Sequence, residues 1–215
     1  MSTAPITHID PAAFHADPYP VLEQMRAHTP ITYVPELGAT LMVLRDDIHL
    51  HEKRIDVFSS HQPDGLMTQL MGTNMMRKDG AAHLEERKAL FPALSPKTVM
   101  QHWKAQFVTA AAAILDDLTP KGACDLMAEF AMPLSAKALK AITGLIEMPA
   151  ARMDAVSQAM IDGCANYAGD PAVEARCNAA TAEIDDHISR MWKAPPDTSA
   201  LAVMQDAGMP EDSIR

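Results

Sequence analysis

Aromatic side chains are scarce in this sequence: they make up 5% of its 215 residues, whereas hydrophobic residues of all kinds make up 48%. Alanine and methionine (16 Met) supply much of the remaining apolar content. These side chains lose little conformational entropy when they enter a helix. The composition therefore favours helices over sheets, and a chain of this length can bury a sizeable core.

Cysteine is also rare. Cys124, Cys164 and Cys177 are odd in number and show no C-x-x-C spacing, which argues against both a disulfide framework and a zinc site. The N-terminus lacks the basic start and apolar run of a signal peptide. No stretch approaches the roughly 20 apolar residues that a membrane span requires. We therefore expect a cytoplasmic protein without a membrane partner.

Positive charge is in deficit, with 18 Lys and Arg against 28 Asp and Glu and a formal net charge of −10. Nucleic-acid binding relies largely on the neutralisation of phosphates by basic side chains. An acidic chain without a long basic run is a poor candidate for it, so we expect no nucleic-acid partner.

The first third of the chain predicts mixed structure. Two β-rich runs around a Pro/Gly turn predict an antiparallel hairpin, and Asp46 or Asp47 is expected to cap the helix that follows it. The expected elements are an extended lead-in over 1–18, a helix over 19–28, strands over 31–34 and 40–44, a helix over 48–53, and an irregular stretch over 59–77.

From Gly80 onward, helical spacing dominates. One apolar stripe ends at Thr119-Pro120, a second runs past Pro133 as a kink or join, and a third lies on a long helix that ends at Trp192. Further helices are expected after Pro149 and over 199–207. The residues of the three stripes are 100, 103, 107, 111, 114, 115 and 118; 127, 130, 134, 139 and 142; and 177, 180, 184, 188 and 191.

The last residues resemble a helix start, because Pro210, Glu211 and Asp212 are the residue types that favour a first helical turn. A helix that begins where the sequence ends suggests a longer protein.

His83 and Arg87 lie four residues apart in a helical segment, so their side chains leave the same face. A His and an Arg placed in this way can hold a pair of carboxylates. Taken alone, the spacing more often belongs to a solvated surface pair.

The stretch 79–99 resembles the C-helix region of cytochrome P450s, which shows Asp-Pro-Pro-Glu-His, an Arg four residues after the His, and Phe-Thr-Pro-basic-x-Val. The N-terminal stretch 16–31 is similar to the family's Asp-Pro-Tyr-Pro opening, and 197–214 to its H-helix and the approach to its I-helix. The matching positions of the first stretch are Asp79, His83, Arg87, Leu94, Ser95, Pro96, Lys97 and Val99.

The resemblance implies a mainly α fold with a small antiparallel sheet near the N-terminus, as in the N-terminal half of a bacterial-type P450. Residues 1–215 would be the N-terminal portion of a single P450 domain that ends at the start of the I-helix. It further implies a haem-thiolate monooxygenase that binds haem b and inserts one atom of O₂ into a small organic substrate. Electrons would come from NAD(P)H through a ferredoxin- or flavoprotein-type donor.

The same resemblance implies the site residues. His83 and Arg87 would bind the haem propionates, with Met76 nearby, and Leu70 and Met71 would contact the substrate. Ordinary packing remains the alternative for each methionine and leucine. No catalytic residue and no protein metal ligand is assigned. The histidines of His49-Leu-His51 lack a third ligand at a useful spacing and fit a solvated helix face better than a metal site.

The sequence departs from the family pattern in three places. Residues 80–82 are Gly-Ala-Ala in place of Pro-Pro-Glu, which predicts a looser start to the helix. Glu85 and Glu86 replace basic or neutral residues, against the basic docking face expected for an acidic ferredoxin. None of the cysteines lies in a Phe-x-x-Gly-x-x-x-Cys-x-Gly setting, so each is expected to be a small buried residue and the iron ligand to lie elsewhere. The alternative function is a non-enzymatic, all-helical ligand-binding or regulatory domain.

Overall fold

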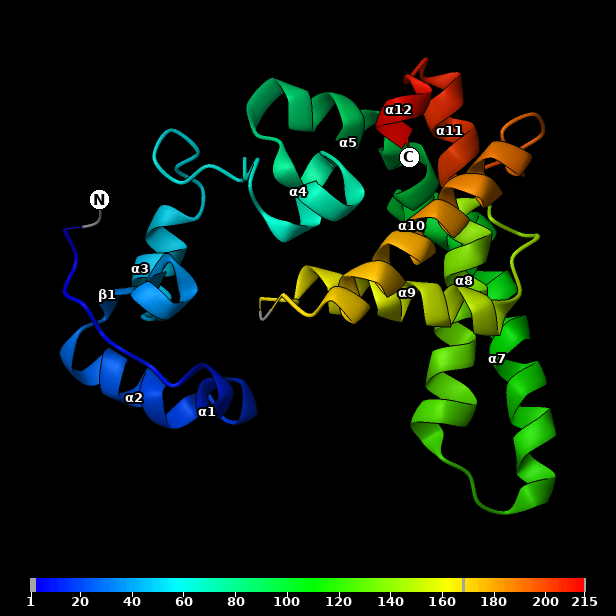
Figure 1. The fold of residues 1–215 in the computed structure, drawn as a ribbon. Helices are drawn as coiled ribbons and strands as arrows, with labels where there is room; N and C mark the ends of the chain where they lie inside the picture. The colour runs from blue at the N-terminus through cyan, green and yellow to red at the C-terminus, as the bar shows by residue number, and fades with distance from the viewer. Residues whose placement is uncertain (1–2, 168, 215) are drawn as a thin grey trace. The chain divides into compact units, whose positions relative to one another are not determined.

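The computed structural model describes residues 3–167 and 169–214, most of which are helical (Figure 1). The predicted fold class, mainly α with a small antiparallel sheet, is confirmed. The chain divides into two compact units, the first running to Ser59 and the second beginning at Ser60. Across the described residues, none of the helices is both long and apolar enough to cross a membrane.

The first unit begins with a helix that the sequence analysis missed. Instead of an extended lead-in throughout, residues 11–16 form α1 (Pro11–Ala16). The Asp10 carboxylate accepts hydrogen bonds from the backbone N–H groups of Ala12 and Ala13 at 2.9 and 3.2 Å, and Pro11 occupies the first turn. This is a strong N-terminal cap, and it outweighs the disruption expected of the three prolines.

The hairpin is confirmed. After α2 (Tyr19–His28), strands β1 (Ile31–Val34) and β2 (Ala39–Met42) pair antiparallel, from Ile31 opposite Met42 to Val34 opposite Ala39. A 3-10 turn, η1 (Pro35–Leu37), joins them, and Gly38 adopts a φ of 61°, which glycine tolerates best.

The last helix of the unit, α3 (Arg45–His51), begins earlier than predicted. Leu44 is the cap residue in place of Asp46 or Asp47. The two acids lie within the first turn, where their negative charge favours the helix through its dipole.

The second unit begins with α4 (Leu66–Met71) and η2 (Met75–Arg77), in a stretch predicted to be irregular. Short helices are seldom stable alone, but α4 contacts both α9 (Ala150–Cys164) and α10 (Pro171–Met191). Tertiary packing therefore explains a helix that local sequence does not predict. The predicted helical region after residue 80 is confirmed as α5 (Gly80–Leu94).

The next helices change phase at a π-helical segment. After α6 (Pro96–Thr98), the π segment η3 (Val99–Trp103) leads into α7 (Lys104–Leu118). Trp103, Ile114 and Leu118 of the predicted stripe are buried, whereas Met100 is 61% exposed and Leu115 46% exposed. A π turn adds a residue to the turn, so a stripe drawn at 3.6-residue spacing cannot stay on one face across it.

The remaining helices form most of the core. Helix α8 (Met132–Thr143) lies beside α7 and follows η4 (Thr119–Lys121) and η5 (Leu126–Ala131); Pro133 lies in its first turn. Figure 1 shows α9 and α10 running side by side. The chain continues through α11 (Ala200–Asp206) to α12 (Glu211–Ile214). The predicted α10 stripe is confirmed, because Cys177, Ala180, Ile188 and Met191 are buried and Ile184 packs against the core.

Helices α9 and α10 approach each other closely at Gly163. A Cβ atom added there would lie within 2.6 Å of the Cys177 Cβ and 3.2 Å from the Leu70 Cδ1. Only a residue without a side chain allows this approach, which also brings α4 against the pair.

Candidate functional site

The start of α5 holds the residues that the sequence analysis selected. Asp79 precedes the helix, and its carboxylate accepts a hydrogen bond from the Ser60 backbone N–H at 2.9 Å instead of capping the helix. Gly80 has a φ of 56°, a left-handed conformation that glycine adopts easily. The Gly-Ala-Ala departure thus gives α5 a start that the family's Pro-Pro pair could not adopt, because proline fixes φ near −65°.

His83 and Arg87 leave the same face of α5. His83 is half-buried and Arg87 is exposed. Within the part of the chain that the structure describes, neither side chain has an ion-pair or hydrogen-bond partner. Both are therefore available to a carboxylate ligand. A solvated surface pair would look the same, so their role in haem binding stays a prediction.

Glu86 does not lie on the protein surface, although the sequence analysis counted it as an acidic residue of the expected ferredoxin-docking face. Its side chain is buried, with 5% of the residue exposed, and it forms an ion pair with Lys78 just after η2. A buried carboxylate needs such a partner. Glu86 therefore adds no negative charge to the surface, and the pair ties η2 to α5.

Leu70 and Met71 are half-buried on α4 and lie against α9. Leu70 points to the close approach of Gly163 and Cys177, and the Met71 Sδ lies 3.9 Å from the Cys164 Sγ at the end of α9. Met76, on η2, is 62% exposed. The structure thus places Leu70 and Met71 together at the junction of α4 and α9, whereas Met76 is largely exposed.

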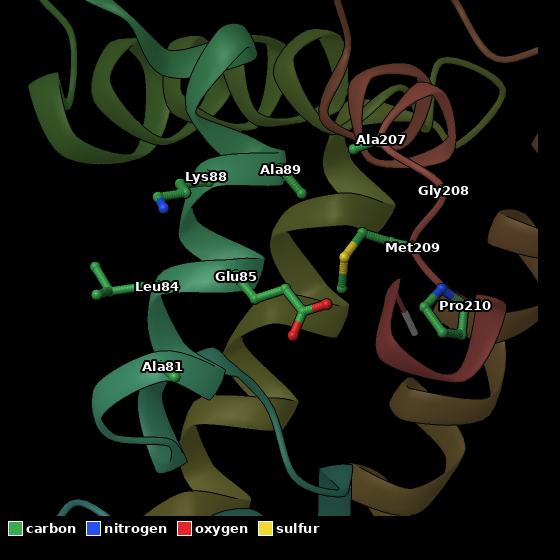
Figure 2. A pocket seen from close by; sticks show the side chains of 9 residues that line it. All are labelled: Ala81, Leu84, Glu85, Lys88, Ala89, Ala207, Gly208, Met209 and Pro210. Carbon is green, nitrogen blue, oxygen red and sulfur yellow. The ribbon is translucent and has the colours of Figure 1, made fainter.

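A cavity of about 560 Å³ lies elsewhere, between α5 and the turn from α11 to α12 (Figure 2). Glu85 points into it toward Met209. None of the predicted site residues lines it, because successive residues of a helix are 100° apart and His83 and Arg87 leave α5 on another side. Its lining residues are Ala81, Leu84, Glu85, Lys88, Ala89 and 207–210.

The structure also reveals polar atoms that the sequence analysis did not select. Three buried side-chain atoms of the described residues have no hydrogen-bond partner: Thr68 Oγ1, Arg77 Nε and His187 Nδ1. Two of them lie in the segment 66–77, beside the predicted substrate residues. A basic residue directly after an apolar run was the only sequence signal for Arg77.

The cysteines differ in their surroundings. Cys124 is exposed, Cys164 is half-buried and Cys177 is buried. Burial raises the pKa of the Cys164 thiol, which the charge of Arg77 partly offsets, and burial also raises the pKa of Cys177. The thiols of Cys164 and Cys177 therefore ionise poorly. The expectation that all three cysteines are buried is wrong for Cys124.

No family model matches the chain. In sequence it is similar to "Putative cytochrome P450 YjiB" of Bacillus subtilis (strain 168), with 25% identity over 142 residues, which are 66% of this chain and 34% of that protein. The chain thus spans about a third of the length of this curated relative.

Many solved structures share its fold, among them three cytochrome P450s. The first is P450BioI, solved with an acyl carrier protein ligated to hexadec-9Z-enoic acid (TM-score 0.76, 14% identity, 95% of this chain and 56% of that one). The second is the cytochrome P450 PksS of the Bacillus subtilis 168 bacillaene polyketide synthase (TM-score 0.71, 19% identity, 94% of this chain and 53% of that one). The third is cytochrome P450 260B1 of Sorangium cellulosum So Ce56 (TM-score 0.69, 21% identity, 99% of this chain and 56% of that one).

These structures define the class of fold: the chain has the fold of the N-terminal part of a cytochrome P450 and covers about half of each P450 chain. The curated sequence match, over 142 residues, is likewise to a cytochrome P450. The likeness extends over nearly the whole chain and is not an accident of one motif.

Proposed function

We propose that the polypeptide containing residues 1–215 is a haem-thiolate monooxygenase that inserts one atom of O₂ into a small organic substrate. Electrons would come from NAD(P)H through a ferredoxin- or flavoprotein-type donor. The observation that supports this best is the pair His83 and Arg87 on one face of α5, without partners among the described residues, in a P450 fold. The likeness to cytochrome P450s supports the reaction class, and the substrate class and electron donor are inferred from that likeness.

The residues present fit a haem. Arg87 would hold one propionate through its planar fork, and His83 would donate a single hydrogen bond to the same pair of carboxylates. Met76, exposed on η2 just before α5, would lie against the haem edge. The haem, proposed to be haem b, supplies the oxygen chemistry when bound, while this chain's side chains bind and orient it.

The iron ligand is proposed to lie outside residues 1–215. Neither buried thiol is prone to ionise, because burial raises the pKa of both Cys164 and Cys177. Exposed Cys124 lacks the glycine-rich setting of the family's cysteine loop. Residues 1–215 would then form the N-terminal portion of one P450 domain, with α12 (Glu211–Ile214) as the start of the I-helix, and would be inactive alone.

Leu70 and Met71 are proposed to contact the substrate. They lie on α4, a short helix whose stability depends on its contacts with α9 and α10. Segments of low local stability that are held by a rigid scaffold often determine binding specificity. Their partial burial leaves part of each side chain available to a ligand.

The test is the spectrum of the natural polypeptide that contains residues 1–215. We expect the reduced, CO-bound protein to show the red-shifted Soret band of a thiolate ligand. A protein that takes up haem but shows only a histidine-type spectrum contradicts the proposal, and one that takes up no haem supports the non-enzymatic alternative.

A further inference from the structure

Arg77 is unusual among the described arginines because one nitrogen of its guanidinium group is buried without a hydrogen-bond partner. Its Nε is inaccessible to solvent and forms no hydrogen bond. Among the described residues, no carboxylate lies within ion-pair distance of its guanidinium. The nearby acid Glu86 is engaged by Lys78. Buried polar atoms are nearly always satisfied, so an exception calls for an acceptor that the chain does not provide.

A second polar atom in the same segment has the same problem. Thr68 Oγ1, on α4, is also buried and unpartnered. Thr68 precedes Met71 by three residues, so the two side chains leave α4 on neighbouring sides. Two of the three such atoms in the described chain therefore fall within residues 66–77.

The surroundings of Arg77 include the side chain of Cys164. Arg77 lies near enough to Cys164 for its charge to affect that thiol, and Cys164 in turn contacts Met71. Burial raises the pKa of the thiol, so Cys164 stays neutral near pH 7 and cannot serve as the counter-ion. The junction of α4 and α9 thus combines one cation with thioether, thiol and leucine side chains.

We propose that the Arg77 guanidinium binds a carboxylate at the α4–α9 junction, with the Thr68 hydroxyl as a further donor in the same segment. The planar fork of arginine matches a carboxylate, and the Leu70 and Met71 side chains at this junction suit the hydrocarbon body that carries it. A carboxylate has two possible sources here: an organic-acid substrate, which would deepen the function proposed above and rests on it, or a haem propionate.

The test uses the haem-loaded natural polypeptide that contains residues 1–215, as wild type, Arg77→Gln and Arg77→Lys. Equilibrium dialysis measures the binding of dodecanoic acid and of dodecan-1-ol, which differ only in the end group. Transfer of haem to an apo-globin measures haem retention. Arg176→Gln is the matched control, because Arg176 is an exposed arginine on α10 without a partner among the described residues.

If the source is the substrate, Arg77→Gln weakens dodecanoic acid binding by at least about tenfold, the loss expected for a charge-assisted hydrogen bond, and leaves dodecan-1-ol unchanged. The affinity of Arg77→Lys for dodecanoic acid lies between those of the wild type and Arg77→Gln, because lysine keeps the positive charge but lacks the planar guanidinium group. If the source is a propionate, Arg77→Gln instead speeds haem transfer by a similar factor and leaves the acid-to-alcohol ratio unchanged.

The proposal is overturned if Arg77→Gln changes neither the acid-to-alcohol ratio nor the rate of haem transfer, or changes them no more than Arg176→Gln does. The proposal is also overturned if the wild type binds dodecanoic acid no better than dodecan-1-ol and Arg77→Gln leaves the rate of haem transfer unchanged. Failure of the proposed function is read separately, from the CO spectrum of the wild type, since dialysis does not depend on the iron ligand.

Discussion

Arg87 and His83 differ in how many hydrogen bonds each can give to a propionate. Arginine can donate two, each charge-assisted and worth about 1.5–3 kcal/mol, whereas histidine donates one. We therefore expect Arg87→Ala to speed haem transfer to an apo-globin about tenfold more than His83→Ala does. Retention equal to that of the wild type in both variants would show that the two residues form a solvated surface pair.

Substitution of Met71 tests whether this residue contacts the substrate or only packs against the protein. Its Sδ contacts the Cys164 Sγ at 3.9 Å, and its side chain is only half-buried. We expect Met71→Ala to change the ratio of kcat/KM for a large and a small substrate, without changing haem content. Pure packing would instead lower the free energy of unfolding by about 2–5 kcal/mol and leave the ratio unchanged. Comparing that ratio with the melting temperature decides between the two.

At the scale of elements, the Lys78–Glu86 pair joins η2 to the start of α5. Lys78→Met would leave the Glu86 carboxylate buried and unpaired, so we expect a loss of about 3 kcal/mol in the free energy of unfolding. The double variant Lys78→Met with Glu86→Leu should recover most of it, because an apolar pair needs no counter-charge. Chemical denaturation of the four proteins of this cycle measures the coupling.

The exposed Lys121–Glu129 pair provides a control for this cycle. Both side chains are largely solvated, so Lys121→Met should change stability far less than Lys78→Met does. Equal losses in the two variants would mean that Glu86 needs no counter-charge and that the pair does not fix the start of α5.

For the whole molecule, the prediction concerns what residues 1–215 can do alone. We expect them to bind haem weakly or not at all, because the thiolate and part of the pocket wall would come from elsewhere in the protein. Titration of haem into this segment, followed in the Soret region and compared with the natural polypeptide, tests the idea. Tight stoichiometric binding by residues 1–215 would contradict it.

Local signals in the sequence predicted much of the secondary structure. The hairpin was predictable because its β-rich strands and Pro/Gly turn are neighbours in the chain. Helix α10 was predictable because its buried stripe keeps a helical period without interruption from Cys177 to Met191. The spacing of His83 and Arg87 likewise follows from one uninterrupted helix, α5.

Only the tertiary structure decided which faces are covered. Burial of Glu86 depends on the chain bringing Lys78 over it, and the short helix α4 depends on α9 and α10 behind it. The π segment η3 broke the helical period of the predicted stripe, and Met100 within this segment is exposed. The sequence likewise gave no sign that the Arg77 Nε lacks a hydrogen-bond partner, because this depends on which residues surround the side chain in the folded protein. Period and turn chemistry act between residues a few positions apart, whereas burial and hydrogen-bond satisfaction depend on residues that are distant in the chain.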